Sequence, residues 1–116
     1  MKRIHYQNVE GQAYPGDLAK GAVGRVVIGK ADGDTRFCMR VFEIAPEGHS
    51  ALHSHDYEHQ VFVHAGRGEV WDGQTWQDIA AGSVIHIPGG EEHQLRNNGQ
   101  ETLIFVCCIP EGAPEM

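Results

Sequence analysis

The stretch from Gly82 to Asn97 reads GSVIHIPGGEEHQLRN and decides which kind of fold the chain adopts. Its first part, 83–87, is rich in β-branched residues, which favours a β-strand. Pro88-Gly89-Gly90 then predicts a tight turn, because proline fixes φ and glycine accepts a positive φ. After the turn, a different strand is expected to begin at His93. Short strands joined by such turns are typical of an all-β protein.

The same pattern of strands and turns extends outward from this stretch in both directions. Strands are expected at 25–28, 37–44, 59–64, 68–71, 83–87 and 102–109. Turn signals separate them, and no stretch of about 12 residues has helical periodicity. Strands at spacings of about 8–12 residues indicate a sandwich or a closed barrel rather than alternating strands and helices. The last residues, 110–116, are expected to form a frayed tail.

Four of the eight histidines are spaced so that they can meet. His53 and His55 form a His-x-His pair, and residues two apart on a strand face the same side. His59 keeps the same parity, and His93 begins a strand elsewhere. Neutral imidazole is a good ligand for transition metals. A lone His-x-His pair is equally well explained by surface histidines in a polar loop, but the longer patterns around these residues favour a metal site.

Two longer patterns contain these histidines and resemble the two motifs of the cupin superfamily over most of the chain. The first runs through Gly48, His53-x-His55, His59 and Gly66, and the second through Gly82, Pro88-x-Gly90, His93 and Asn97. The second matches the family pattern residue for residue. The first departs from it twice, because one residue is missing between Gly48 and His53, and His59 stands where the family usually has glutamate.

The resemblance implies a fold, a domain organisation and an assembly. The fold is expected to be an all-β double-stranded β-helix, a jelly-roll barrel with a metal ion inside near one mouth. Residues 1–116 are expected to form a single cupin domain, with motif one at 48–66 and motif two at 82–97. Cupins of this size are commonly dimers, so a symmetric homodimer is expected.

The resemblance also directs the choice of metal ligands. The family usually uses three histidines and a glutamate, but the parity of Glu58 places it on the opposite face from His55 and His59. We therefore expect the ligands to be His53, His55, His59 and His93. The string from His55 to Val63, HDYEHQVFV, is similar to small bacterial cupins with all-histidine sites, which are associated with manganese or other divalent ions and with oxygen-dependent chemistry. One divalent ion per chain is expected, manganese first, with Fe, Ni, Cu, Co and Zn as alternatives.

Four neutral ligands leave the charge of a divalent ion uncompensated, so an oxygen anion should bind in any open position. An ion that prefers six ligands would keep two positions open, whereas four-coordinate zinc would be closed and structural. Because free histidine has a pKa of about 6.5, metal affinity is expected to fall steeply below about pH 6.

Three further residues are candidates for the pocket wall and for catalysis: Arg40, Phe105 and Cys107. Arg40 could neutralise a bound anion, or its stem could cover the barrel mouth with the charged head in water. Cys107 could be a pocket thiol prone to oxidation, but the interpretation as a small core residue is favoured. In the group of cupins that the sequence resembles, the strands that correspond to 37–44 and 102–109 line the pocket beside the metal.

The composition excludes several classes of partner and function. The 116 residues carry a formal charge of −7 without a Lys/Arg cluster, which argues against binding nucleic acid or an anionic membrane. The first residues lack the apolar run of a signal peptide, and the three cysteines, Cys38, Cys107 and Cys108, fit free thiols. We therefore expect a cytoplasmic protein.

The leading hypothesis is a metal-dependent enzyme, a dioxygenase or related oxidoreductase that uses O₂ and acts on a small organic anion. One alternative is a non-catalytic cupin module that binds or senses a small ligand. A weaker alternative is a sugar isomerase, whose substrates usually need several basic contacts to phosphate. The fold alone does not decide among them, because one barrel hosts many chemistries.

Overall fold

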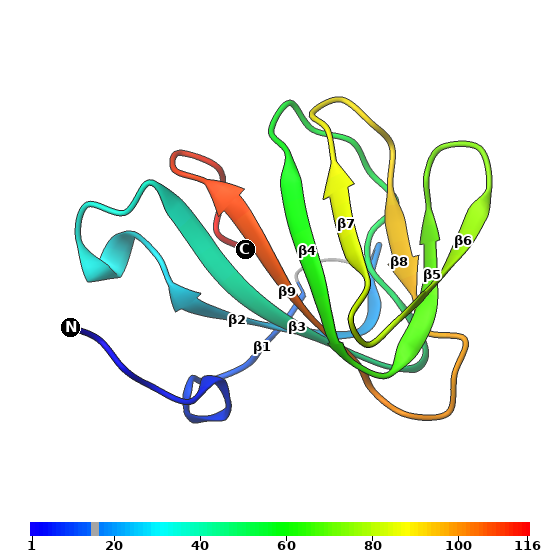
Figure 1. Cartoon of the computed structure of the whole chain (residues 1–116), viewed down its shortest axis with the longest axis horizontal. Coiled ribbons are helices and arrows are strands. Elements are labelled where there is room, and N and C mark those ends of the chain that lie inside the picture. The colour runs from blue at the N-terminus through cyan, green and yellow to red at the C-terminus, as the bar shows by residue number, and fades with distance from the viewer. Residues whose placement is uncertain (15–16) are drawn as a thin grey trace.

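The computed structural model describes residues 1–14 and 17–116, and within these ranges it consists of β-strands with two short 3₁₀ turns (Figure 1). The strands are β1 Gln12–Ala13, β2 Lys20–Ile28, β3 Phe37–His49, β4 His59–Ala65, β5 Arg67–Trp71, β6 Trp76–Ala80, β7 Val84–Ile87, β8 Gln94–Arg96 and β9 Leu103–Pro110. The turns are η1 Tyr6–Asn8 and η2 Lys30–Asp32. The all-β class expected from the sequence is confirmed.

All six of these expected strands form, and β8 is the strand that was expected to begin at His93, whereas β1 and β6 were not predicted. Strands β1, β6 and β8 are short and bury few side chains: β1 buries none, β6 only Ile79 and β8 only Leu95. A strand that buries few side chains shows little alternation of apolar and polar residues in its sequence, and this alternation is the signal from which strands are predicted. Strand β3 also continues beyond the expected end at Ile44, as far as His49.

The strands form one strongly curled antiparallel sheet in the order β6-β5-β8-β3-β9-β4-β7, with β2 paired to β3 and β1 paired to β2 (Figure 1). The long strand β3 is central to the curl, since it pairs with β2 and β9 and, at His49, with β8. The inward faces of the sheet enclose an apolar core in which Ile44, Val63, Leu103 and Ile109 are fully buried. Packing in this core holds β3, β4 and β8 in place, and the four motif histidines lie at, next to or between the ends of these strands.

The glycines and the asparagine of the two motifs bring the motifs together in space. The Asn97 N–H donates to the carbonyl of Gly48 (2.9 Å), so the start of motif one meets the end of motif two. The N–H of Ala81, just before motif two, donates to the carbonyl of Gly66 (3.1 Å), at the end of motif one. The side chain of Asn97 is buried and donates to the carbonyl of Ile44 (2.9 Å). These residues therefore hold the barrel together around the histidines.

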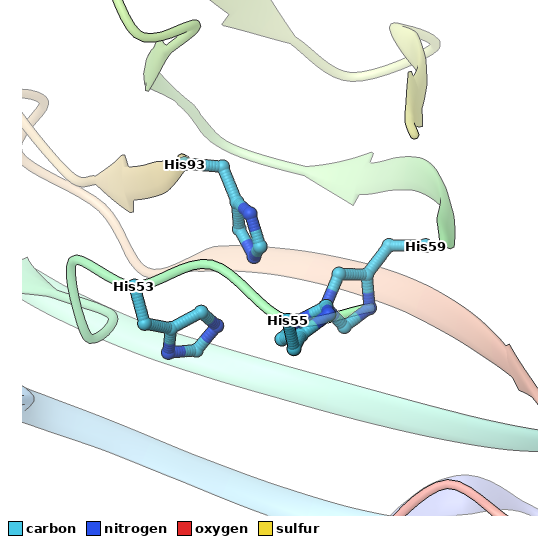
Figure 2. A group of neighbouring side chains, drawn as sticks. All are labelled: His53, His55, His59 and His93. Carbon is cyan, nitrogen blue, oxygen red and sulfur yellow. The ribbon is translucent and has the colours of Figure 1, made fainter. Parts of the chain in front are cut away.

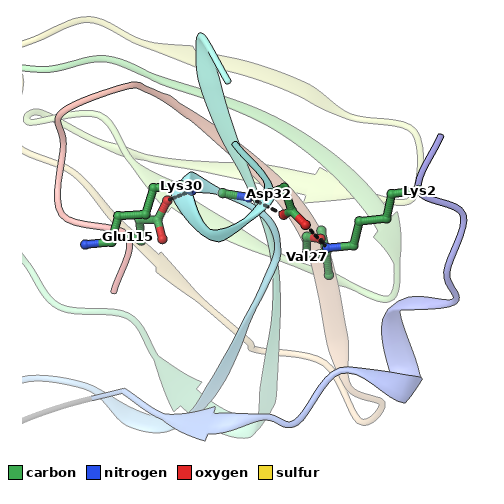
Figure 3. Close-up of polar contacts among 6 residues, drawn as sticks. Lys2, Val27, Lys30, Asp32 and Glu115 are labelled. Carbon is green, nitrogen blue, oxygen red and sulfur yellow. Dashed lines mark hydrogen bonds and ion pairs between the residues drawn. The ribbon is translucent and has the colours of Figure 1, made fainter. Parts of the chain in front are cut away.

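The segment from Glu111 to Met116 folds back against the barrel, contrary to the frayed tail expected from the sequence. A carboxylate oxygen of Glu115 accepts a hydrogen bond from the backbone N–H of Lys30 (2.8 Å), as Figure 3 shows. Ala113 and Met116 pack against the core cluster. The tail contacts were not predictable from its composition, because proline, glycine and charge are also typical of disordered ends. No helix in the described part of the chain is long and apolar enough to cross a membrane.

Candidate metal centre

The four motif histidines come from three separate segments of the chain. His59 is the first residue of β4, and His93 directly precedes β8. His53 and His55 lie in the connection between β3 and β4, where an isolated antiparallel bridge pairs His53 with His93. Two backbone hydrogen bonds close this bridge, from His53 N–H to the carbonyl of His93 (3.2 Å) and in the reverse direction (3.0 Å). The two motifs are thus joined at two of the histidines themselves.

The His-x-His pair reaches the cluster by a different route from the expected one. The sequence suggested a strand through His53 and His55, but strand geometry is confined to the bridge at His53, and the chain bends at Asp56 and Tyr57. The turn of motif two holds this bend in place. The N–H of Gly90 donates to the carbonyl of His55 (2.6 Å), and a Cβ on Gly89 would collide with the carbonyl group of Asp56.

The four imidazole rings face one another, as Figure 2 shows, and one ring nitrogen from each lies within 4.8 Å of the others. The Nε2 atoms of His55 and His59 are 2.7 Å apart. An ion about 2.1 Å from every nitrogen requires that no two be more than about 4.2 Å apart. The nitrogens must therefore move closer together to share a single ion, and the all-imidazole donor set suits a divalent transition metal. Glu58 is exposed, as its parity indicated.

Two of the rings are fixed in the tautomer that a metal ligand needs. Nδ1 of His55 is 2.8 Å from the carbonyl oxygen of Tyr57, and Nδ1 of His93 is 2.9 Å from that of Glu91. A carbonyl only accepts hydrogen bonds, so the hydrogen resides on Nδ1 and the lone pair on Nε2. The ring of Tyr57 also stacks on His55, with centroids 3.9 Å apart. This contact was not predicted, although Tyr57 lies only two residues from His55.

Burial favours the neutral form of His53, His59 and His93. It is the main reason why the pKa of His59 falls to about 3 and that of His53 to about 4, with Arg40 adding to the first effect and His93 to the second. Burial also lowers the pKa of His93. Neutral imidazole has the free lone pair that a metal ion requires, so the site is prepared to bind a cation near neutral pH.

Arg40 lies behind His59, and its charged head is buried rather than in water. The side chain is only 5% exposed, which excludes the alternative of a stem covering the barrel mouth. Its Nη2 atom is 3.3 Å from Nδ1 of His59 and 3.1 Å from Sγ of Cys107. Its Nε atom has no hydrogen-bond partner, and no salt bridge to Arg40 occurs among the described residues. Buried charges are normally paired, so this cation favours an anionic ligand nearby.

The histidines line one wall of a cavity of about 330 Å³, the size range of small-molecule sites. Arg40, Phe105 and Cys107, the pocket candidates, all lie on its wall. Cys107 is also part of the hydrophobic core, as the favoured interpretation held, and burial raises the pKa of its thiol. The remaining wall is mostly apolar and includes Phe42, Ile44, Val61, Ile87, Leu95 and Met116. No aspartate or glutamate occurs among the described lining residues.

The other histidines stay outside the cluster. His64 and His86 are exposed on β4 and β7, and His49 lies at the end of β3, where its Nδ1 is 2.9 Å from the carbonyl oxygen of Ser50. Pro114 and Met116 line the cavity although they belong to the segment expected to be frayed, so the sequence analysis did not identify them. The structure thus selects the four motif histidines from the eight in the chain.

Comparisons with known proteins agree with this architecture. The profile of the family described as Cupin domain matches residues 40–109. The polyketide cyclase RemF from Streptomyces resistomycificus has a similar structure, with a TM-score of 0.89 and 29% identity, over 95% of this chain and 79% of that one. A cupin-2 domain protein from Rhodospirillum rubrum gives a TM-score of 0.85 and 26% identity, over 97% of this chain and 76% of that one. The expected jelly-roll barrel is confirmed.

A curated protein gives a partial sequence match. The 1-methylthio-D-xylulose 5-phosphate methylsulfurylase of Rhodospirillum rubrum is 37% identical over 71 residues, which are 61% of this chain and 46% of that protein. The chain therefore spans about half the length of this relative. The fold and the histidine cluster together suggest a metal site.

Proposed function

Because the chain belongs to the cupin domain family, we propose that it is a metal-dependent oxidoreductase of the dioxygenase type that acts on a small organic anion. The observation that carries the proposal is a cluster of four imidazoles on the wall of a cavity whose described lining has no acidic residue. A cation held there keeps its full charge, which favours an anionic substrate oxygen beside it. We expect His53, His55, His59 and His93 to be the ligands.

A divalent ion bound to these residues would supply Lewis acidity and open positions for a substrate oxygen and for O₂. Manganese remains the first expectation, with Fe, Ni, Cu and Co as alternatives, because these ions accept more than four ligands. Zinc with four histidines would be closed. The protein's own part is to hold the donors neutral and to exclude water with the apolar wall formed by Phe42 and Phe105, whose rings stack with centroids 5.5 Å apart.

Arg40 is proposed to bind the charged group of the substrate. Its guanidinium is buried at the cavity wall without an acidic partner in the described ranges, so an incoming carboxylate or enolate would complete its pairing. The mostly apolar wall would accept the remaining body of the molecule. These properties together favour an anion with an apolar body over a highly hydroxylated one.

The test is oxygen consumption by protein loaded separately with Mn, Fe, Ni, Co or Cu, across small enolisable carboxylates such as phenylpyruvate. We expect uptake of O₂ with at least one metal and none with the His59→Ala variant. If no loaded form consumes O₂, the proposal is wrong. Tight binding of a carboxylate that is recovered unchanged would instead support the non-catalytic binding module.

The named relative supports a second candidate, chemistry on a methylthio-substituted sugar phosphate. The methylthio group would suit the apolar wall, but Arg40 is the one lysine or arginine among the described lining residues, and a phosphate usually has several basic contacts. The small number of basic residues at the cavity also weakens the sugar isomerase alternative, because the substrates of such enzymes carry a phosphate. Binding of a pentulose 5-phosphate more tightly than phenylpyruvate would favour this candidate over the first.

A further inference from the structure

We propose that Cys107 is the positioning residue of the candidate metal centre: its sulfur accepts the hydrogen bond from Nδ1–H of His59 that leaves Nε2 of the same ring free to bind the ion. The inference rests on the metal-binding part of the proposed function and requires no particular reaction. Nothing in the cupin motifs points to it, since Cys107 lies outside both of them, on β9.

His59 presents Nε2 to the cluster and Nδ1 to the interior of the barrel. Its Nε2 lies 2.7 Å from Nε2 of His55, whereas its Nδ1 lies 3.0 Å from Sγ of Cys107. A neutral imidazole carries one hydrogen, so an Nε2 that binds a metal requires the hydrogen on Nδ1. His59 is only 7% exposed, so an Nδ1–H without an acceptor would be a buried, unsatisfied donor, which is unfavourable.

Cys107 is the acceptor that the surroundings of Nδ1 offer. Among the described residues, the other side chain at hydrogen-bond distance from this atom is Arg40, at 3.3 Å, and a guanidinium has only donors. His55 and His93 direct Nδ1 at backbone carbonyls, which any sequence would provide. His59 alone among these three depends on a side chain, and that side chain is the buried thiol of Cys107, 3% exposed.

Because Arg40 lies beside Nδ1 of His59, the metal-binding tautomer of His59 requires the sulfur of Cys107 as an acceptor. In the other tautomer, Nδ1 of His59 would accept from Arg40 and Nε2–H would donate to His55, so that tautomer is also satisfied and competes with metal binding. Once an ion takes Nε2, the hydrogen on Nδ1 and the N–H of Arg40 are two donors facing each other. The sulfur of Cys107 accepts from both, since it lies 3.0 Å from one and 3.1 Å from the other.

Three variants separate this role from simple packing. Cys107→Ala removes the acceptor, and Cys107→Ser keeps a group that accepts hydrogen bonds. Cys38→Ala is the matched control, because Cys38 is an equally buried free cysteine that has no hydrogen bond to His59. We expect Cys107→Ala to bind Co²⁺ or Mn²⁺ about 10–100-fold more weakly, the usual effect of losing such a support, and Cys107→Ser to recover part of the loss. Cys38→Ala should bind as the unaltered protein does.

Spectroscopy tests the hydrogen bond itself. With Zn²⁺ or Co²⁺ bound, the Nδ1–H proton of His59 should give a slowly exchanging signal in the unaltered protein and in Cys107→Ser, but not in Cys107→Ala. The visible absorption of the Co²⁺ form should also change in Cys107→Ala alone. Equal affinities and identical spectra in Cys107→Ala and the unaltered protein would overturn the inference. If Cys107→Ala does not fold, absence of the Nδ1–H signal from the unaltered protein would overturn it, whereas failure of that protein to bind any metal would refute the proposed function.

Discussion

At the scale of single residues, the site partly or fully removes imidazoles from water: His59 and His93 are buried, and His53 and His55 are half-buried. The pKa of free histidine, about 6.5, led to the expectation that metal affinity falls below about pH 6. In the folded chain, burial lowers the pKa of His59 to about 3 and that of His53 to about 4, so protons compete with the metal only at lower pH. The sequence identified these residues, but the extent of their burial depends on the assembled barrel.

The lowered pKa values predict how the stability of metal-free protein depends on pH. Between about pH 6.5 and pH 4, the unfolded chain binds protons at His53 and His59 that the folded chain does not bind. The contribution of these two histidines to the free energy of unfolding should therefore be largest above about pH 6.5. The free energy of unfolding should decrease as the pH falls through this range. Urea unfolding of chelator-treated protein measures it. His59→Gln should lose less stability over the same range, and an equal loss would contradict the prediction.

Arg40 carries a separate prediction about the ligand. Arg40→Met should weaken binding of phenylpyruvate to the metal-loaded protein by about tenfold or more, because a hydrogen bond to a charged group contributes about 1.5–3 kcal/mol. Arg40→Lys, which keeps the charge, should weaken it less. Isothermal titration measures both, with metal content determined in parallel. Unchanged phenylpyruvate affinity in a metal-replete Arg40→Met variant would show that Arg40 does not contact the anion.

At the scale of elements, the strands were largely predictable and the histidine loop was not. Period-two burial identified the long strands, such as β4 and β9, because each alternates between core and surface. The segment carrying His53 and His55 lacks that regularity. Its shape depends on the turn at Pro88-Gly89-Gly90, which is distant in sequence and binds the carbonyl of His55 through Gly90. The motif spacing predicted that the histidines meet, but it did not predict the contact between the two loops that positions His55.

This contact can be tested at Gly89. Gly89→Ala should displace the backbone of Asp56, move His55 out of the cluster and lower metal affinity by about tenfold or more, since a Cβ there meets backbone rather than a flexible side chain. Gly99→Ala is the matched control, because a Cβ at that position first meets the Arg67 side chain, at 3.1 Å, which can move. Competition against a fluorescent chelator measures both. Equal affinities in the two variants would contradict the clamping role of the turn.

At the scale of the whole molecule, the two motifs were sufficient to predict the barrel but not its interior. The fold follows because the N–H of Asn97 donates to the carbonyl of Gly48, and the N–H of Ala81, just before motif two, donates to the carbonyl of Gly66. The cavity, by contrast, depends on Met116 and on the burial of Arg40. Those features arise from packing between distant segments, which a local pattern does not record.

The homodimer remains a prediction at this scale. Phe62 and Val84 face each other across β4 and β7 and are 49% and 78% exposed, an apolar pair on the outer surface that a symmetric interface would cover. Light scattering should give twice the mass of the chain, and Val84→Asp should shift the population towards monomer. A monomeric mass at all concentrations for the unaltered protein would contradict the dimer.

The metal content of the protein tests the central claim most directly. Elemental analysis of protein purified without added metal should give about one Mn, Fe, Ni, Co or Cu per chain. The ion should be lost in His59→Ala and retained in His64→Ala, which alters an exposed histidine on the same strand. Absence of metal even after reconstitution, or equal metal in both variants, would contradict a four-histidine site. One firmly held zinc per chain would contradict the open, catalytic centre.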